Sequence, residues 1–137
     1  MYDETMVAPM RKEVTDMGGV ELRTAADVES QLMNVKEPTL VFVNSVCGCA
    51  AGGARPGLAL ALQHSKLPAK MTTVFAGQDT EATAAARSLF VGYMPSSPQI
   101  ALLKGGKCVA MMERHDIEGR MPVEIANALV QIFEKHC

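Results

Sequence analysis

Residues 39–66 read TLVFVNSVCGCAAGGARPGLALALQHSK, and this stretch decides the fold. Its first part, residues 39–45, is apolar, β-branched and aromatic, which predicts a buried strand. Its second part, residues 50–66, is rich in alanine and leucine, which predicts a well-buried helix that Pro56 should kink. The segment Cys47-Gly48-Cys49 falls between these two elements. Two thiols therefore lie at the carboxyl end of a buried strand and face the amino terminus of a helix.

This position suits thiol–disulfide exchange, because backbone N–H groups at a helix N-terminus favour a thiolate over a thiol. Cα atoms two residues apart are separated by roughly 5 to 7 Å, and a disulfide needs about 4.4 to 6.8 Å, so Cys47 and Cys49 can bridge. We expect Gly48 to supply the backbone freedom for this small ring, and the ring to be strained and readily reduced. Cys47, nearer the strand, is the expected exposed nucleophile. Cys49, deeper toward the helix, is the expected resolving thiol.

The rest of the chain alternates between helical and extended patterns. The expected helices are 6–17, 24–35, 50–66, 80–90 and 122–133, and the expected strands are 20–23, 39–45, 70–76, 100–104 and 107–113. Alternating units predict an α/β protein with a mainly parallel sheet and helices on both faces, and Gly105-Gly106 predicts a closing antiparallel hairpin. With the cysteines after the second strand, this order resembles a thioredoxin fold that carries an extra N-terminal helix. We expect residues 1–137 to form a single domain of this type.

Composition excludes several classes of protein. The 137 residues are 48% hydrophobic and carry a net charge of −2 with scattered charges, so no basic face for nucleic acid is expected. No apolar run is long enough to cross a bilayer, and the acidic segment Met1–Thr5 lacks the apolar region of a secretory signal. We therefore expect a cytoplasmic protein with no membrane partner. In a reducing cytoplasm, paired cysteines are more often catalytic, redox-sensing or metal-binding than structural.

The cysteine pair has other interpretations. Both thiols could be small buried hydrophobes. The pair could also hold a metal: it offers two thiolates where Zn²⁺ needs four ligands, and Cys108, His115, His136 and Cys137 could complete the set. The long spacings and the lack of a second short pair argue against this, so we expect no bound metal or cofactor. A third possibility is a redox-dependent interaction protein without turnover, which would capture partners on oxidation and not release them to added thiol.

Pro98 is the next candidate for the site. In thioredoxin-like folds, the proline at this place is cis and faces the cysteines. Pro95 competes for this assignment, but we choose Pro98 because a strand follows it directly. Backbone groups of Ser97 could then pair with a disulfide-bearing substrate as an added strand. The alternative is an ordinary trans proline at the start of a strand.

Four further residues carry weaker signals. Arg55, two helical turns past Cys49, could reach solvent near the site and bind a carboxylate of a small thiol, although we favour a solvated or ion-paired helix residue. We expect His115 to lie in a surface turn and Cys108 to be a structural thiol. We expect Cys137, the last residue, to be mobile and reactive through exposure.

The chain resembles the bacilliredoxin family, small thioredoxin-fold proteins of bacteria. The matching stretches are Pro9–Arg11 with Glu13, Val43–Gly52, Ala54–Pro56, Val74–Asp79, Pro95–Pro98, Ala101–Lys104, Arg114–Gly119 and His136–Cys137. The departures are minor: Gly19-Val20 stands where a Gly-Phe pair is expected, and Tyr93-Met94 stand where smaller residues are expected. Tyr93 could narrow the groove beside Pro98.

The resemblance implies an activity and a co-substrate. It implies removal of bacillithiol from mixed disulfides on cytoplasmic proteins, with bacillithiol as co-substrate. Carried over to this chain, Cys47 attacks the mixed disulfide and takes up the low-molecular-weight thiol, and Cys49 or a second free thiol releases it. Members also resemble protein disulfide isomerases in activity. The implied partners are bacillithiolated or disulfide-bearing proteins, and the implied substrate-binding residues are Gly48, Ser97, Pro98 and Arg55.

Overall fold

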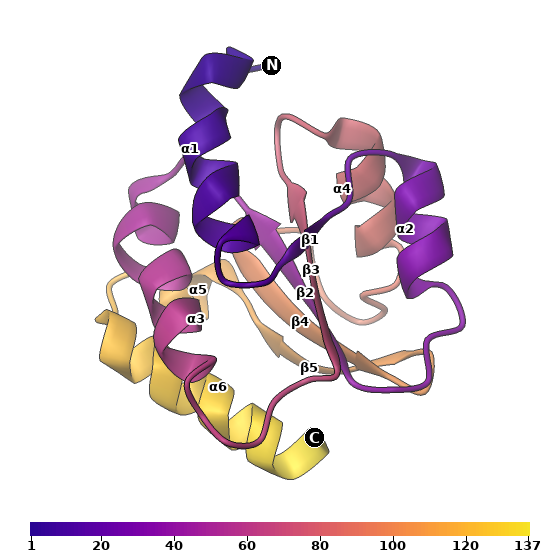
Figure 1. The fold of residues 1–137 in the computed structure, drawn as a ribbon, viewed down its shortest axis with the longest axis vertical. Coiled ribbons are helices and arrows are strands. Elements are labelled where there is room, and N and C mark those ends of the chain that lie inside the picture. Colours follow the sequence, from indigo (N-terminus) through magenta and orange to yellow (C-terminus); the bar gives the residue numbers. More distant parts are fainter.

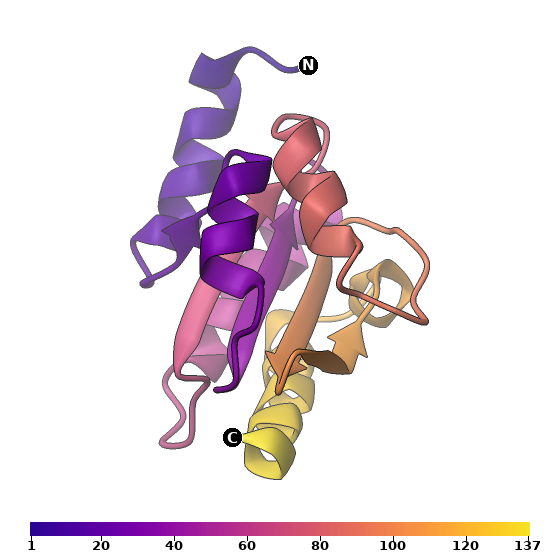
Figure 2. The same cartoon turned by 90° about the vertical axis from the view of Figure 1, so that its right-hand side faces the viewer.

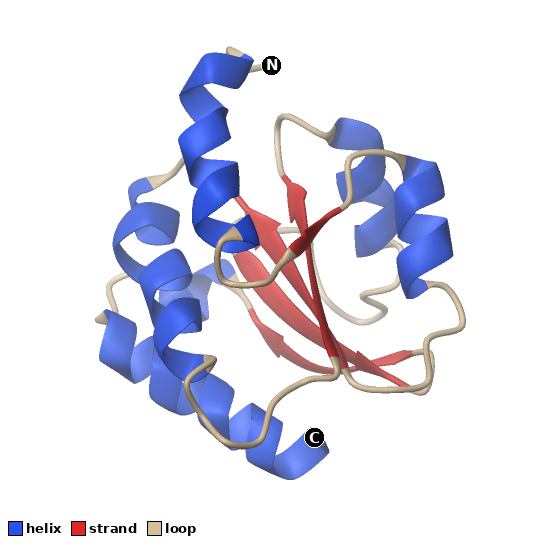
Figure 3. Cartoon of the chain, viewed as in Figure 1, coloured by secondary structure: helices blue, strands red, loops and turns tan.

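One five-stranded sheet separates two layers of helices in the computed structural model, which describes residues 1–137 (Figures 1 and 3). The strands are β1 (Val20–Glu21), β2 (Thr39–Asn44), β3 (Lys70–Phe75), β4 (Gln99–Lys104) and β5 (Lys107–Met112). The helices are α1 (Glu4–Thr15), α2 (Ala25–Leu32), η1 (Ala50–Ala54), α3 (Arg55–Ala61), α4 (Thr80–Arg87), α5 (Arg114–Ile117) and α6 (Pro122–His136).

The sheet is mixed and has the strand order β1-β3-β2-β4-β5. β1 and β2 run parallel to β3, whereas β4 runs antiparallel to β2 and pairs with β5 in the closing hairpin. β2 lies at the centre, and all six of its residues are buried. The predicted thioredoxin-like α/β fold, with parallel strands, an antiparallel C-terminal hairpin and an additional N-terminal helix, is confirmed.

Each face of the sheet has its own core. On one face Phe42 packs with residues of α1, α3 and α6, and on the other Val41 and Val43 pack with residues of α2 and α4. Figures 1 and 2 show these two layers, with α1, α3 and α6 on one side of the strands and α2 and α4 on the other. Alternate residues of β2 thus face opposite cores, as the pleat of a strand requires.

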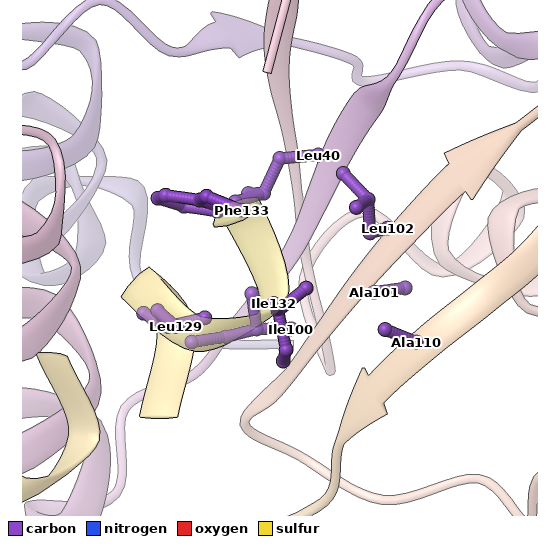
Figure 4. Close-up of a pocket in the computed structure, with 8 residues that line it drawn as sticks. All are labelled: Leu40, Ile100, Ala101, Leu102, Ala110, Leu129, Ile132 and Phe133. Atoms are coloured by element: carbon purple, nitrogen blue, oxygen red, sulfur yellow. The ribbon is translucent and has the colours of Figure 1, made fainter. Parts of the chain in front are cut away.

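The contact between α6 and the sheet is tightly filled. Figure 4 shows Leu129, Ile132 and Phe133 of α6 beside Leu40 of β2 and Ile100 of β4. The space between these side chains does not admit a water molecule, and all the residues that line it are hydrophobic. This region is therefore part of the packed core and fixes α6 against the strands.

The helix expected over residues 50–66 differs from its prediction in two ways. It opens as the π-helical turn η1, in which the N–H of Arg55 donates to the carbonyl of Ala50, five residues earlier. Pro56 has no backbone N–H to donate, and this widened turn lies directly before it. The α-helical part ends at Ala61, because the N–H groups of Gln63 and His64 bond to carbonyls three residues earlier instead of four. The expectation of a helix to residue 66 is therefore wrong.

Candidate active site

Cys47 and Cys49 form a disulfide between the end of β2 and the start of η1. Their Cα atoms are 5.5 Å apart, which lies in the range expected from the spacing. Both cysteines are half-buried and Gly48 is exposed, so burial does not separate the two thiols. The expected backbone role of Gly48 is wrong for this oxidised state: its φ is not positive, and an added Cβ would meet nothing within 4 Å.

The backbone around Cys47 is arranged as the amino terminus of a helix. Its carbonyl accepts the first hydrogen bonds of that helix, from the N–H groups of Ala50 at 3.0 Å and Ala51 at 3.2 Å. The N–H groups of Gly48 and Cys49 come before these bonds and have no intrahelical partner of their own. Such N–H groups provide the positive electrostatic potential that favours a thiolate.

A buried polar network holds the loop that carries Cys47. The N–H of Cys47 donates to the hydroxyl of Ser45 at 3.2 Å, and the N–H of Ser45 donates to Oδ1 of Asn44 at 2.9 Å. Nη1 of Arg55 donates to the same Asn44 oxygen at 2.9 Å and to the Ser45 carbonyl at 3.0 Å. One guanidinium on α3 therefore contacts Asn44, the last residue of β2, and Ser45, the residue that follows it.

The helix α1 closes this network from the outside. Nε of Arg55 donates to Glu13 at 3.0 Å, and Nδ2 of Asn44 donates to the carbonyl of Met10 at 3.1 Å. The Arg55 side chain is only 3% exposed, so the expectation that it reaches solvent is wrong. The ion-paired alternative is confirmed. Arg55 is buried because it lies three residues before Leu58, on the same buried face of α3. This spacing can be read from the sequence.

The segment before β4 lies at the same end of the sheet as the cysteines, because Gln99, the first residue of β4, pairs with Val43 near the end of β2. The Ser97–Pro98 peptide bond is cis and Pro98 is buried, which confirms the choice of Pro98 over Pro95. The carbonyl of Ser97 accepts a hydrogen bond from Nη1 of Arg114 at 3.3 Å. The neighbouring Ser96 carbonyl accepts one from Nη2 of Arg87 at 2.7 Å. Two arginines therefore hold this segment in place, and sequence reasoning assigned no role to either.

The short helix α5 lies at the same end of the sheet as the cysteines. Met112, the last residue of β5, is opposite Ile100, and Ile100 is opposite Phe42 near the end of β2. Ile117 of α5 is buried beside Gly53 of η1. The sequence predicts a surface turn at His115, whereas the structure has this one-turn helix, on which the imidazole is 74% exposed.

The other two cysteines lie at the opposite end of the sheet. Cys108 is opposite Leu103, which is opposite Thr39 at the start of β2, and Lys104 binds the carbonyl of the residue before Cys137. Burial raises the pKa of both thiols. Cys137 is half-buried against the core and its N–H bonds to Phe133, so it lacks the exposure expected of it.

This arrangement does not assemble the metal set considered from the sequence. Cys108 and Cys137 lie at the far end of the sheet from the bonded pair Cys47 and Cys49. The group of side chains that does converge, Glu113, His115 and Asp116, contains no cysteine. The alternative of a metal-binding module built on the C-x-C pair is not favoured.

None of the helices has the length and apolar character that a bilayer crossing requires.

Comparison with known proteins gives consistent results. A protein family described as "Disulphide isomerase" matches residues 2–137. A bacilliredoxin of Shouchella clausii is 52% identical over 136 residues, which cover 99% of this chain and 94% of that protein. A bacilliredoxin of Staphylococcus epidermidis is 49% identical over 137 residues, covering 100% of this chain and 94% of that protein. The structure of Fasciola hepatica thioredoxin superimposes with a TM-score of 0.59 at 22% identity, covering 86% of this chain and 99% of that chain.

Proposed function

This chain belongs to the bacilliredoxin family and is a thiol–disulfide oxidoreductase, and on that premise we propose that it removes bacillithiol from mixed disulfides on cytoplasmic proteins. The observation that carries the proposal is the Cys47–Cys49 disulfide at the junction of a buried strand and a helix N-terminus. A redox-active pair in this place can alternate between a dithiol and the disulfide. Ser97 and Pro98 lie at the same end of the sheet as this pair, since the next residue, Gln99, pairs with Val43 of β2, and this position supports their role in binding a substrate chain.

The first step is an exchange at the substrate's mixed disulfide. The Cys47 thiolate attacks the sulfur of bacillithiol in the protein–bacillithiol disulfide, forms a Cys47–bacillithiol disulfide and breaks the substrate's S–S bond. The leaving group is the protein's cysteine thiolate, which takes a proton from water. The unpaired N–H groups of Gly48 and Cys49 favour the thiolate that this step needs.

The second step clears the active site. The Cys49 thiolate attacks the Cys47 sulfur, forms the intramolecular disulfide and releases bacillithiol as a thiolate that is then protonated. Alternatively, a second free thiol attacks the bound bacillithiol sulfur and leaves Cys47 reduced. In the first route a dithiol or two monothiols must then reduce the Cys47–Cys49 bond. Cys108 and Cys137 lie at the other end of the sheet, which supports Cys49 as the resolving thiol of this chain.

The substrate-binding residues act through backbone atoms in this proposal. A substrate segment would lie alongside Ser97 and Pro98 as an added strand, and Gly48, which is exposed and has no side chain, would leave room beside the cysteines. The Ser97 carbonyl accepts one hydrogen bond from Arg114 and has a second lone pair, so such a strand can pair with this carbonyl as well as with the Ser97 N–H. Arg55 is buried beneath the loop, and its contribution is therefore indirect.

The test uses a protein whose single accessible cysteine carries bacillithiol. We expect the reduced wild-type chain to release bacillithiol, the Cys49→Ser chain to accumulate a bacillithiol adduct on Cys47, and the Cys47→Ser chain to do neither. Mass spectrometry of both proteins identifies each adduct and the sulfur that holds it. Full release by Cys47→Ser would overturn the assignment of the nucleophile. Equal release from glutathione and cysteine adducts would overturn the assignment of bacillithiol as the specific co-substrate.

Disulfide isomerisation is the second candidate, favoured by the description of the matched family. Isomerisation requires Cys47 to form a mixed disulfide with the substrate, and one of the substrate's own thiols then displaces it. Cys49→Ser should therefore retain most of the isomerase rate, measured as the reactivation of a protein with scrambled disulfides, while it loses the resolution of the bacillithiol adduct. A chain with no activity on scrambled disulfides would exclude this second function.

A further inference from the structure

Arg55 is the buried charge that is bonded most directly to the Cys47 loop. Its guanidinium reaches the carbonyl of Ser45 at 3.0 Å, and Ser45 in turn accepts a hydrogen bond from the N–H of Cys47 at 3.2 Å. Consecutive Cα atoms are about 3.8 Å apart, so the Cα atom of Cys47 lies within roughly 7 Å of the Cα atom of Ser45. The Arg55 side chain is 3% exposed, and water and salt therefore screen its charge less than they screen a surface charge.

Glu13 is the counter-charge of this arginine and comes from another element. Its Oε2 lies 3.0 Å from Nε of Arg55, and its side chain is 51% exposed. It stands on α1, the helix that precedes the thioredoxin-like part of the chain. The carboxylate opposes the effect of the guanidinium on a nearby thiolate, while its hydrogen bond holds the guanidinium in position.

We propose that Arg55 is a positioning residue for the Cys47 loop that also stabilises the Cys47 thiolate, and that Glu13 of α1 sets how much of the Arg55 charge the thiolate experiences. This inference rests on the proposed function only in taking Cys47 as the attacking thiol. Arginine suits the role because its planar fork donates to Asn44, the Ser45 carbonyl and Glu13 at once. The N-terminal helix thereby becomes part of the reactive site.

Other charges at this end of the sheet are engaged elsewhere or exposed. They are Arg11, Asp79, Glu81, Arg87, Glu113, Arg114, His115, Asp116, Glu118, Arg120 and Glu124. Asp79 is bonded to Arg11, and Arg114 is bonded to Glu118. None of these pairs involves a residue of the network that holds Cys47, so the Glu13–Arg55 pair can be tested separately.

The test measures the pH dependence of Cys47 alkylation by neutral iodoacetamide on the reduced full-length chain, with mass spectrometry to assign each label. The alkylation rate follows the thiolate fraction and needs no bacillithiol, so this experiment can fail while the proposed function stands, and the reverse. Glu13→Gln should lower the pKa of Cys47 and raise its alkylation rate at pH 6 by about two- to fivefold. Arg55→Met should act in the opposite sense and lower that rate at least threefold, roughly the effect of one nearby charge. Arg55→Lys should fall between wild type and Arg55→Met.

Glu4→Gln is the matched control. Glu4 is also on α1, is 49% exposed and is paired with a buried arginine, Arg11, but this arginine does not contact the Cys47 loop. Its substitution should leave the Cys47 rate unchanged. The inference is overturned if Glu13→Gln changes the rate no more than Glu4→Gln does, or if Glu13→Gln and Arg55→Met shift it in the same direction. If Arg55→Met does not fold, the opposite shifts of Glu13→Gln and Arg55→Lys still decide the question.

Discussion

Asp79, at the start of α4, accepts two hydrogen bonds from Arg11 of α1, from Nη1 at 2.7 Å and from Nη2 at 2.9 Å. The Arg11 side chain is 6% exposed and that of Asp79 is 10% exposed, and the guanidinium carbon lies 5.3 Å from the centre of the Phe75 ring. The pair joins α1 to the carboxyl end of β3. Together with the Glu13–Arg55 pair, it fixes α1 at the end of the sheet where the cysteines lie.

Breaking the Arg11–Asp79 pair should destabilise the fold. Asp79→Asn removes the charge that compensates a buried guanidinium, and we expect it to lower the free energy of unfolding by about 2 to 3 kcal/mol, because Glu4 still compensates part of the charge. Urea denaturation measures this loss as a lower midpoint, while the slope of the unfolding free energy against urea concentration stays unchanged. Asp16→Asn is the control, since it breaks the exposed ion pair with Lys12 and should change the stability by less than about 0.5 kcal/mol. Equal stability of the two variants would contradict the structural role of the buried pair.

The close approach of α3 and α6 makes a second prediction. A Cβ on Gly57 would lie 2.8 Å from Cγ2 and 2.9 Å from Cβ of Ile125, and 3.2 Å from the carbonyl of Pro122. These atoms belong to the backbone or lie next to it, so they can move only if α6 moves. Gly57→Ala should therefore destabilise the chain by about 1 to 3 kcal/mol in thermal or urea unfolding.

Gly52 is the matched control for Gly57, because both are glycines of the continuous η1–α3 helix. A Cβ at Gly52 would meet nothing within 4 Å, and its φ is not positive. Gly52→Ala should be neutral or should stabilise the protein by up to about 1 kcal/mol through helix propensity. A Gly57→Ala chain as stable as Gly52→Ala would show that α6 moves aside at no energetic cost.

The sequence contains much of this fold in local patterns. The run at residues 39–45 specifies β2, the helical spacing of apolar residues from Pro122 specifies α6, and the cysteines fall at the junction that the pattern indicates. The strand that starts directly after Pro98 sufficed to choose it over Pro95. Each of these features depends on residues close together in the chain.

The features that the sequence does not reveal depend on distant partners. The burial of Arg55 depends on its ion pair with Glu13, which lies 42 positions earlier in the chain. The helix α3 is shorter than expected, and the residues after it, His64 and Lys66, bond to Glu134 of α6 instead. Helix propensity favours residues 62–66 as helix, but these tertiary contacts and the path to β3 override it. An arginine on the buried stripe of an apolar helix, and a polar Asn-Ser pair at the end of an apolar strand, are the signals that could have indicated the network.

The positions of the four thiols predict their order of reaction. Burial raises the pKa of Cys108 and Cys137, so each has a smaller thiolate fraction at neutral pH than an exposed thiol. After mild reduction, iodoacetamide at pH 7 should label Cys47 before Cys49, Cys108 or Cys137, and the rates at Cys108 and Cys137 should keep rising as the pH is raised above 9. Time-resolved peptide mass spectrometry measures the four rates.

The same reaction in 8 M urea is the control, since unfolding should remove most of the difference. Faster labelling of Cys49 than of Cys47 would reverse their roles, and faster labelling of Cys108 would contradict its burial.

The cap of α2 gives a prediction for acid conditions. The Asp27 carboxylate accepts hydrogen bonds from the N–H groups of Arg23 and Thr24, and these bonds hold its pKa below the ordinary value of about 3.9 for an aspartate. Because the folded state depresses the pKa, the resulting stabilisation is complete above the ordinary value and is lost as the pH falls through the folded value. The difference in unfolding free energy between wild type and Asp27→Asn should therefore shrink between pH 5 and pH 2.5.

Ser30→Ala, which removes only a neutral hydrogen bond to the Asp27 carbonyl, should show a difference from wild type that does not change with pH. A difference for Asp27→Asn that stayed constant across this range would mean that the carboxylate charge adds nothing to the cap.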